Sequence, residues 1–245
     1  MKKILLIVLV IVTMSCGKDN PIEPTLEINF EPVSTGQIVR QAYYSLAYSE
    51  ENEQPSWVFY QLNLENINGT QSRTDDFRAD PAVSTGSASL NDYKGSGYDR
   101  GHLCPAADMT QNKTAMSESF FLSNMSPQTA GFNRGIWSVA ESQVRKWGLE
   151  YEKLYVVTGP IFKDNIGTIG ANVVTIPGYY YKIVFDGKDK MIGLILPHAS
   201  SSKNLDEFVV TVDFIEQQTG IDFFKGLDDP LEKNLEGRIS ISGWF

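Results

Sequence analysis

Histidine and cysteine are scarce in this chain of 245 residues, which contains two of each. The cysteines are Cys16 and Cys104, so the fold cannot depend on a network of disulfide bonds. The same scarcity leaves no set of thiolates and imidazoles of the kind that Zn²⁺ favours. Internal repeats and low-complexity runs are also lacking, so nothing divides the chain beyond its amino-terminal segment.

The amino-terminal segment lacks an apolar run long enough to span a bilayer. Lys2 and Lys3 precede a short apolar run at 4–12, a pattern typical of an export signal. Cys16 follows a small residue at the cleavage point, as in a relaxed bacterial lipobox. Residues 1–16 are therefore interpreted as a signal segment that leaves a lipidated Cys16 at the outer membrane or cell surface. Ordinary cleavage, with a periplasmic or extracellular product, is the alternative.

Residues 17–37 contain Pro21, Pro24 and Pro32 with little periodicity, which predicts an extended linker. Residues 38–245 are enough for one domain with its own core. Alternating apolar side chains predict strands at 57–62, 154–158, 179–185 and 191–196. Helices are expected at 138–147, from 206 onward and at 212–218, the last capped by Thr211. Strands dominate and do not alternate with helices, so the predicted class is α+β.

Positive charge is in short supply, and the formal net charge of the chain is −9. An acidic surface repels a polyanion, so composition alone argues against a nucleic-acid partner. The segment 71–147 differs, because it holds eight basic and eight acidic residues. A neutral cleft with converging arginines and a divalent cation could still hold a phosphate group there.

The run 98–108 reads YDRGHLCPAAD and places one of the two histidines beside an arginine. His102 titrates near neutral pH, and Arg100 sets a fixed positive charge two residues before it. This combination is a plausible start for a site that cleaves phosphodiesters. A histidine held in a turn is the alternative that the run alone leaves open.

A second run, 133–145, begins with Asn133 and continues with residues spaced by four. On one helix, Trp137, Glu141 and Arg145 share a face. The helix could then present an amide oxygen, a carboxylate and a guanidinium to one cleft. Few hard oxygen ligands, completed by water, are what Mg²⁺ accepts.

Together these runs resemble the DNA/RNA non-specific endonucleases with a ββα-metal active site, a family that includes secreted bacterial nucleases and mitochondrial endonuclease G. The resemblance rests on Asp99-Arg100-Gly101-His102, on Asn124 and Gln128, and on the run from Asn133 to Arg145. Other blocks follow in the family's order: 57–62, 73–81, 154–160, 176–182 and 211–224. The family implies a central, mainly antiparallel sheet flanked by helices.

The resemblance also implies roles for single residues. His102 is expected as general base, Asn133 as ligand of Mg²⁺ (or another divalent cation such as Mn²⁺), and Glu141 as holder of metal-bound water. The implied catalytic set is His102, Arg100, Glu141, Arg73, Arg145 and Asn124. The implied nucleic-acid contacts are Arg73, Arg100, Arg134 and Arg145.

Several of these residues also have plainer interpretations. Arg78 is close enough to Arg73 to compete for its role, and Asn124 could chiefly shape a turn beside the cleft. Cys104 is interpreted as a small buried residue rather than a nucleophile. His198 matches no functional position of the family and is interpreted as structural.

The function that follows is metal-dependent hydrolysis of DNA and RNA phosphodiesters with little sequence preference, and the resemblance implies 5′-phosphate products. The predicted partners are nucleic acid and, through the lipid, a membrane. A homodimer stays open, since members of the family are often dimers. Two alternatives remain: a catalytically inactive, surface-anchored binding lipoprotein on the same fold, and a nuclease restricted to one type of nucleic acid.

Overall fold

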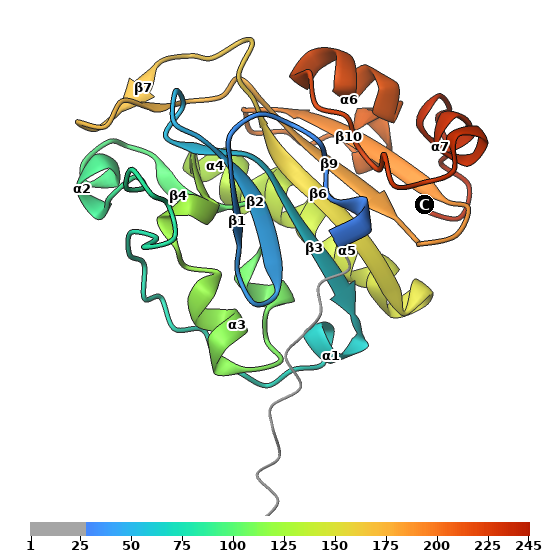
Figure 1. Cartoon of the computed structure of the whole chain (residues 1–245), viewed down its shortest axis with the longest axis horizontal. Helices are drawn as coiled ribbons and strands as arrows, with labels where there is room; N and C mark the ends of the chain where they lie inside the picture. Colours follow the sequence, from blue (N-terminus) through green and yellow to red (C-terminus); the bar gives the residue numbers. More distant parts are fainter. Residues whose placement is uncertain (1–27) are drawn as a thin grey trace, which may run out of the picture.

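The computed structural model describes residues 28–245, and a seven-stranded sheet lies at its centre (Figure 1). The strand order is β1-β2-β3-β6-β9-β10-β11, and every neighbouring pair is antiparallel. The strands are β1 Gln37–Arg40, β2 Tyr44–Ser49, β3 Gln54–Asn63, β6 Lys153–Ile161, β9 Tyr179–Phe185, β10 Met191–Pro197 and β11 Val209–Val210. The predicted α+β class with an antiparallel central sheet is confirmed.

Strand β6 shows how the sequence makes a sheet that is buried on both faces. Leu154 and Val156 belong to one apolar core, whereas Tyr155 and Val157 belong to another. Successive side chains of a strand point to opposite faces, so an apolar run needs cover on both sides. The sheet is therefore the middle one of three layers.

Helices supply this cover from two parts of the chain. Helix α5 (Ser138–Tyr151) packs on the first face through residues such as Ala140 and Val144. Helices α6 (Val212–Thr219) and α7 (Asp229–Glu236) pack on the second face through Ile215 and Leu235. The Thr211 hydroxyl accepts a hydrogen bond from the Phe214 N–H at 3.1 Å, so it caps α6 as predicted.

A smaller antiparallel pair leads into α5. It consists of β4 (Asp99–His102) and β5 (Met125–Gln128), with His102 opposite Met125. After β5, the wide turn η4 (Asn133–Trp137) interrupts the helical path, because Gly135 adopts a non-helical conformation (φ −103°, ψ −117°). The chain therefore differs from the single helix that the spacing predicted: Asn133 lies before a kink, and α5 begins after it.

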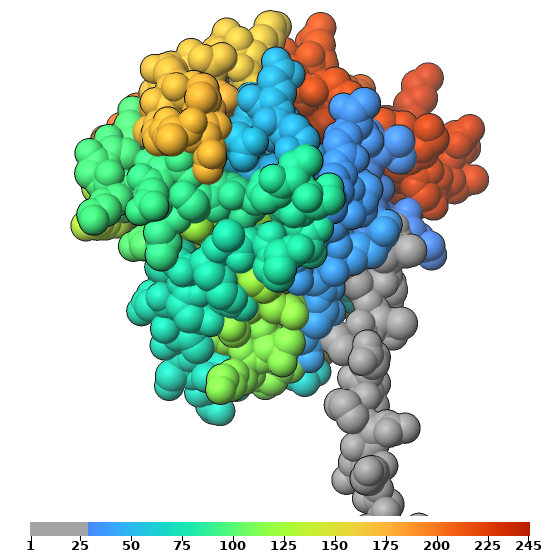
Figure 2. All heavy atoms as spheres, turned by 60° about the vertical axis from the view of Figure 1, so that its left-hand side comes forward, coloured from blue at the N-terminus to red at the C-terminus, as the bar shows by residue number. Residues whose placement is uncertain are grey.

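The remaining helices and strands of the described chain are short. They are η1 Ile28–Phe30, α1 Leu64–Ile67, α2 Leu90–Tyr93, η2 Ala106–Asp108, α3 Lys113–Glu118, η3 Leu122–Asn124, α4 Ala130–Phe132, β7 Thr168–Ile169, β8 Val174–Thr175 and η5 Leu205–Phe208. Figure 2 shows that the turquoise and green segments, which include α2 and α3, gather on one face of the molecule. None of the helices within residues 28–245 is both long and apolar enough to cross a membrane.

Part of the predicted linker packs onto the domain. The Phe30 ring contacts the Tyr155 ring, with centroids 4.8 Å apart. The Val33 N–H donates to the Asp222 carbonyl at 2.8 Å, which ties this segment to the chain beyond α6. The packed domain therefore begins before residue 38. The signal segment, Cys16 and the first part of the linker lie outside the described residues.

Candidate active site

Strand β4 ends at His102 and holds it against both β5 and α5. A Cβ on Gly101 would lie 2.2 Å from the Gln128 side chain, so only glycine permits this close pairing of β4 with β5. The His102 carbonyl accepts a hydrogen bond from the Trp137 indole N–H at 3.1 Å. The strand and the start of α5 are thereby fixed to each other, and His102 lines a cleft together with Glu141.

The His102 ring is packed among aromatic side chains and is 9% exposed. Its centroid lies 4.9 Å from that of Phe120 and 5.7 Å from that of Phe77. Nε2 has no hydrogen-bond partner among the described residues. Burial, followed by the positive charges of Arg73 and Arg100, lowers the pKa of His102 to about 3. The ring is therefore neutral near pH 7, with Nε2 buried, and the residue lines the cleft in a form that can accept a proton.

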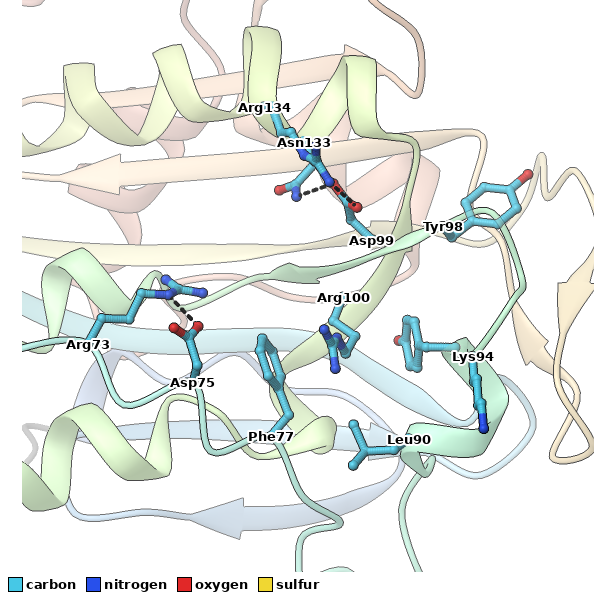
Figure 3. A pocket seen from close by; sticks show the side chains of 11 residues that line it. Arg73, Asp75, Phe77, Leu90, Lys94, Tyr98, Asp99, Arg100, Asn133 and Arg134 are labelled. Carbon is cyan, nitrogen blue, oxygen red and sulfur yellow. Dashed lines mark hydrogen bonds and ion pairs between the residues drawn. The ribbon is translucent and has the colours of Figure 1, made fainter.

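A cleft of about 330 Å³ opens beside His102, and Asn133 enters it from the turn before α5. Asn133 Nδ2 donates a hydrogen bond to the Asp99 carboxylate at 3.0 Å. The amide oxygen is consequently directed away from Asp99 (Figure 3). The other residues that line the cleft are Arg73, Arg100, Pro105, Ala106, Ala107, Arg134, Ser138 and Glu141.

Two arginines bring positive charge to the cleft on aromatic supports. The Arg100 guanidinium lies 4.0 Å from the centroid of the Phe77 ring. Arg73 lies over Phe120 at 4.7 Å and donates from Nε to Asp75 at 2.7 Å. Among residues 28–245, Arg100 forms no ion pair with a carboxylate, so its charge remains available to an anion.

Arg134 is the third arginine at the cleft. It makes two hydrogen bonds to the Asp99 carboxylate, at 2.9 and 2.8 Å, and its side chain is 72% exposed. The three arginines and Asn133 also line an adjoining hollow of about 590 Å³ that Tyr93, Tyr98 and Lys94 extend (Figure 3). The two hollows share Arg73, Arg100, Asn133 and Arg134, and together they are called the basic groove.

A buried lysine, Lys182, lies near Glu141 and the Trp137 ring. Lys182 is fully buried, with Nζ 3.3 Å from the Thr158 hydroxyl and 4.2 Å from the centre of the Trp137 ring. Burial lowers the pKa of Lys182, and the negative charge of Glu141 opposes this shift. Burial likewise raises the pKa of Glu141, against the positive charge of Lys182. Each charge therefore helps to keep the other ionised.

A second buried pair completes this network. The Asp108 carboxylate is fully buried and accepts hydrogen bonds from Arg145 Nη1 at 2.8 Å and from the Tyr60 hydroxyl at 2.9 Å. Burial raises the pKa of Asp108, and Arg145 lowers it. Together with Glu141 and Lys182, the network contains two acidic and two basic side chains.

Most of the predicted site residues come together in the groove, and the structure distinguishes the two competing arginines. Arg73 lines both hollows, whereas Arg78 is held by Asp76 and the Ser117 carbonyl and lines neither. The phosphate role that the sequence left open is therefore better suited to Arg73.

Two of the predicted catalytic residues do not line the groove. Asn124 is fully buried; its side-chain oxygen accepts from the Cys104 N–H, and its amide nitrogen donates to the Cys104 and Ser119 carbonyls. All its polar atoms are used in this way, so it positions the chain after His102 and does not contact the reacting atoms. Arg145 is directed to Asp108 and lines neither hollow, so its position suits a support of the cleft wall.

Several residues of the site went unassigned in the sequence. Asp99 and Asp108 stand within the run 98–108, but the chain alone does not reveal that one orients Asn133 and the other holds Arg145. Lys182 could have been found from the sequence, because it lies inside an otherwise apolar strand. A lysine buried in that way needs a partner of opposite charge or a hydrogen-bond acceptor. Nothing in the sequence identifies Phe77 and Phe120 as supports of the His102 ring.

Cys104 and His198 have the structural roles that the sequence indicated. Cys104 is fully buried, and burial raises the pKa of its thiol, which makes it a poor nucleophile. His198 Nε2 accepts a hydrogen bond from the Thr129 N–H at 2.8 Å, and Nδ1 donates to the Pro177 carbonyl at 2.7 Å. Both of its nitrogens are used for packing the chain.

A ββα unit that sets a neutral histidine, an amide oxygen and arginines around one groove has the features of an enzyme that cleaves phosphodiesters. Residues 23–230 match the family described as DNA/RNA non-specific endonuclease, and this chain belongs to that family. It is a hydrolase of the endonuclease type.

Individual relatives agree with this assignment. Nuclease C1 of Cunninghamella echinulata var. echinulata is 32% identical over 218 residues, which cover 81% of this chain and 86% of the relative. Mitochondrial endonuclease G of Bos taurus is 31% identical over 205 residues, covering 76% and 69%. A chain from the crystal structure of the EndoG/EndoGI complex has a TM-score of 0.75 and 29% identity, over 84% of this chain and 93% of that one.

Proposed function

We propose that this endonuclease depends on a divalent metal ion, cleaves both DNA and RNA with little sequence preference, and uses His102 as its general base. The observation that carries the proposal is that a neutral His102 lines the same cleft as Asn133, Glu141 and the arginines. A complete set of proton acceptor, oxygen ligand and cations also favours catalysis over an inactive binding protein on the same fold.

His102 performs the proton transfer. Its neutral ring can remove a proton from a water molecule in the cleft, and that water then attacks phosphorus. Phe77 and Phe120 hold the ring in place, so little reorganisation is needed when the proton moves. The Trp137 hydrogen bond fixes the backbone from which the ring projects. Attack by water that expels the 3′ oxygen leaves a 5′-phosphate and a 3′-hydroxyl.

Arg73 and Arg100 stabilise the negative charge that develops on the phosphate. Both face the groove from its sides and are held by aromatic rings, so they are in place before the substrate arrives. Their charges also help to keep His102 neutral. The same two arginines therefore serve both the binding of the phosphate and the protonation state of the base. Arg134, which is exposed and paired with Asp99, contacts the nucleic-acid backbone farther along the groove.

The residues present fit a Mg²⁺ ion at Asn133. The Asp99 hydrogen bond takes the amide nitrogen of Asn133 and leaves the oxygen as a ligand, while Glu141 lines the same cleft and can hold metal-bound water. A bound ion would supply charge neutralisation at the phosphate and the leaving oxygen. A single neutral oxygen donor predicts weak binding to the free protein and tighter binding with nucleic acid.

The reaction is tested with supercoiled plasmid, single-stranded DNA and RNA, each incubated with purified protein in Mg²⁺ or in excess EDTA. Cleavage of all three substrates should require the ion. The products should accept label from polynucleotide kinase only after phosphatase treatment, as 5′-phosphate ends demand. Full cleavage in EDTA would contradict the metal dependence, and cleavage of one type of nucleic acid alone would contradict the broad specificity.

We further propose that the protein is exported and anchored through lipid on Cys16. The basic start, the short apolar run and the small residue before Cys16 support this, as does the polar sequence at 17–20, which is typical of the tether that follows a lipidated cysteine. Anchoring would confine degradation of nucleic acid to the vicinity of the envelope.

A further inference from the structure

Three carboxylates meet between helices α6 and α7, on the face of the sheet opposite α5. They belong to Asp213 and Glu216 of α6 and to Glu236 of α7, and one oxygen from each lies within 4.8 Å of the other two. The two helices lie side by side in Figure 1, near β9 and β10. None of the three residues lines the basic groove.

Glu236 is the unusual member of this cluster. It is 4% exposed, and its Oε1 has no hydrogen-bond partner among the described residues. A buried, unpartnered carboxylate oxygen is costly, because an ionised carboxylate loses its water without replacement. The neighbouring Leu235 packs in the core beneath α7, so the burial of Glu236 follows from the docking of its helix.

The surroundings of the cluster add negative charge. The charges that act most strongly on Glu236 are those of Glu216, Glu232, Asp213 and Asp222, all carboxylates. Of these acids, Asp222 is paired with Lys225 at 3.3 Å. Burial and the neighbouring carboxylates raise the pKa of Glu236 to about 9, so a cation between α6 and α7 would allow Glu236 to ionise near pH 7.

The cluster also retains a carboxylate oxygen of Glu216 that accepts no hydrogen bond from the described residues. Glu216 Oε1 accepts a hydrogen bond from the Phe223 N–H at 2.8 Å, which fixes the side chain and leaves its second oxygen free. Gly237 follows Glu236, and a Cβ there would lie 3.3 Å from Asp213 Oδ2, a tighter contact than is usual. Glycine at this position avoids that contact with the Asp213 carboxylate.

We propose that Asp213, Glu216 and Glu236 bind a calcium ion that joins α6 to α7. Calcium takes carboxylate oxygens at 2.3–2.6 Å in a flexible geometry and completes its shell with water. Two oxygens on opposite sides of such an ion are about 4.6–5.2 Å apart, so the three carboxylates can reach it with little movement. The ion stabilises the helical layer on the second face of the sheet and is separate from the ion of the active site.

The test measures thermal unfolding and calorimetric binding of the full chain, first stripped with EDTA and then titrated with CaCl₂. At ten times the dissociation constant, calcium should raise Tm by roughly 3–6 °C. MgCl₂ should raise it less, because a smaller ion needs the oxygens drawn closer together. No rise at 10 mM CaCl₂ would overturn the proposal, and an equal rise with Mg²⁺ would overturn the choice of calcium.

Variants locate the ion. Glu236→Gln should remove the calcium response and, in EDTA, should unfold no earlier than wild type, because a neutral amide replaces a carboxyl group that burial already keeps protonated. Asp213→Asn, at an exposed position, should weaken calcium binding at least tenfold and serves if Glu236→Gln does not fold. Glu150→Gln, an exposed change on α5, and Asn133→Ala, at the cleft, should respond as wild type does. A response that survives Glu236→Gln or disappears with Asn133→Ala would show that calcium binds elsewhere.

Discussion

Replacing His102 by alanine should abolish most nuclease activity and leave the fold in place. Loss of a positioned general base typically costs ~10²–10⁴-fold in rate. At 1.36 kcal/mol for each factor of ten, this corresponds to about 2.7–5.4 kcal/mol of transition-state stabilisation. His102 is expected to give a large loss, because it supplies the imidazole of the cleft, which His198 does not line.

The effect on stability should be small, since two contributions oppose each other. The variant loses ring contacts with Phe120 and Phe77, worth about 0.5–1.5 kcal/mol each. It also removes a buried nitrogen without a partner, whose desolvation costs about 1–3 kcal/mol. The free energy of unfolding should therefore change by at most about 1–2 kcal/mol, and Tm by a few degrees.

His198 provides a matched control, because it is the other histidine of the chain. His198→Ala strands the Thr129 N–H and the Pro177 carbonyl, at about 1–3 kcal/mol each. For a domain of this size, Tm should fall by roughly 5–15 °C. The turnover of the protein that remains folded should stay close to that of wild type.

Plasmid nicking near neutral pH with Mg²⁺ measures the rate, and circular dichroism during heating measures Tm. The reasoning is refuted if His102→Ala retains more than a tenth of the wild-type rate. It is equally refuted if His102→Ala is unfolded at the assay temperature, since its lost activity would then have a structural origin.

Two further predictions concern the same site, and a third concerns the amino-terminal segment. Because His102 must be neutral and its pKa is lowered, the rising limb of kcat/KM against pH should lie below the ordinary value of about 6.5. Arg100→Gln should move the histidine titration of metal-free protein, followed by NMR, to higher pH. A limb at or above 6.5 that Arg100→Gln leaves unmoved would contradict the proposed effect of burial and of Arg100 on the His102 pKa. Asn133→Ala should lose activity at ordinary Mg²⁺ concentration, Asn133→Asp should keep part of it, and Glu141→Ala should be milder; an Asn133→Ala protein as active as wild type across a Mg²⁺ titration would place the ligand elsewhere. Cys16→Ser should abolish labelling by palmitate that wild type shows during growth, and equal labelling would exclude the anchor.

The sequence by itself determined the class of the fold and most of the groove. Alternating apolar residues identified the long strands, since the two-residue period depends only on local geometry. The resemblance of the blocks around His102, Asn133 and Glu141 to a known family indicated the chemistry, which the run around His102 alone left open. Arg73 was also named, although Arg78 competed with it.

The tertiary structure decided which of these side chains contact the groove. Asn124 uses all its polar atoms on backbone groups, and Arg145 faces a buried acid, yet both belong to the recognised motif. The kink at Gly135 separates Asn133 from α5, which a regular spacing could not reveal. Such outcomes depend on partners far along the chain, so no local pattern reports them.

Contacts between distant parts of the chain also decided which charged residues are buried. Lys182 is placed behind Trp137 only because β9 packs beneath the turn before α5, and Glu236 is buried only because α7 docks beside α6. Burial sets the protonation of a charged group, and burial is a property of the packed layers. The sequence determined which groups this protein has, whereas the packing of its layers decided which of them are open to a substrate, a metal ion or a proton.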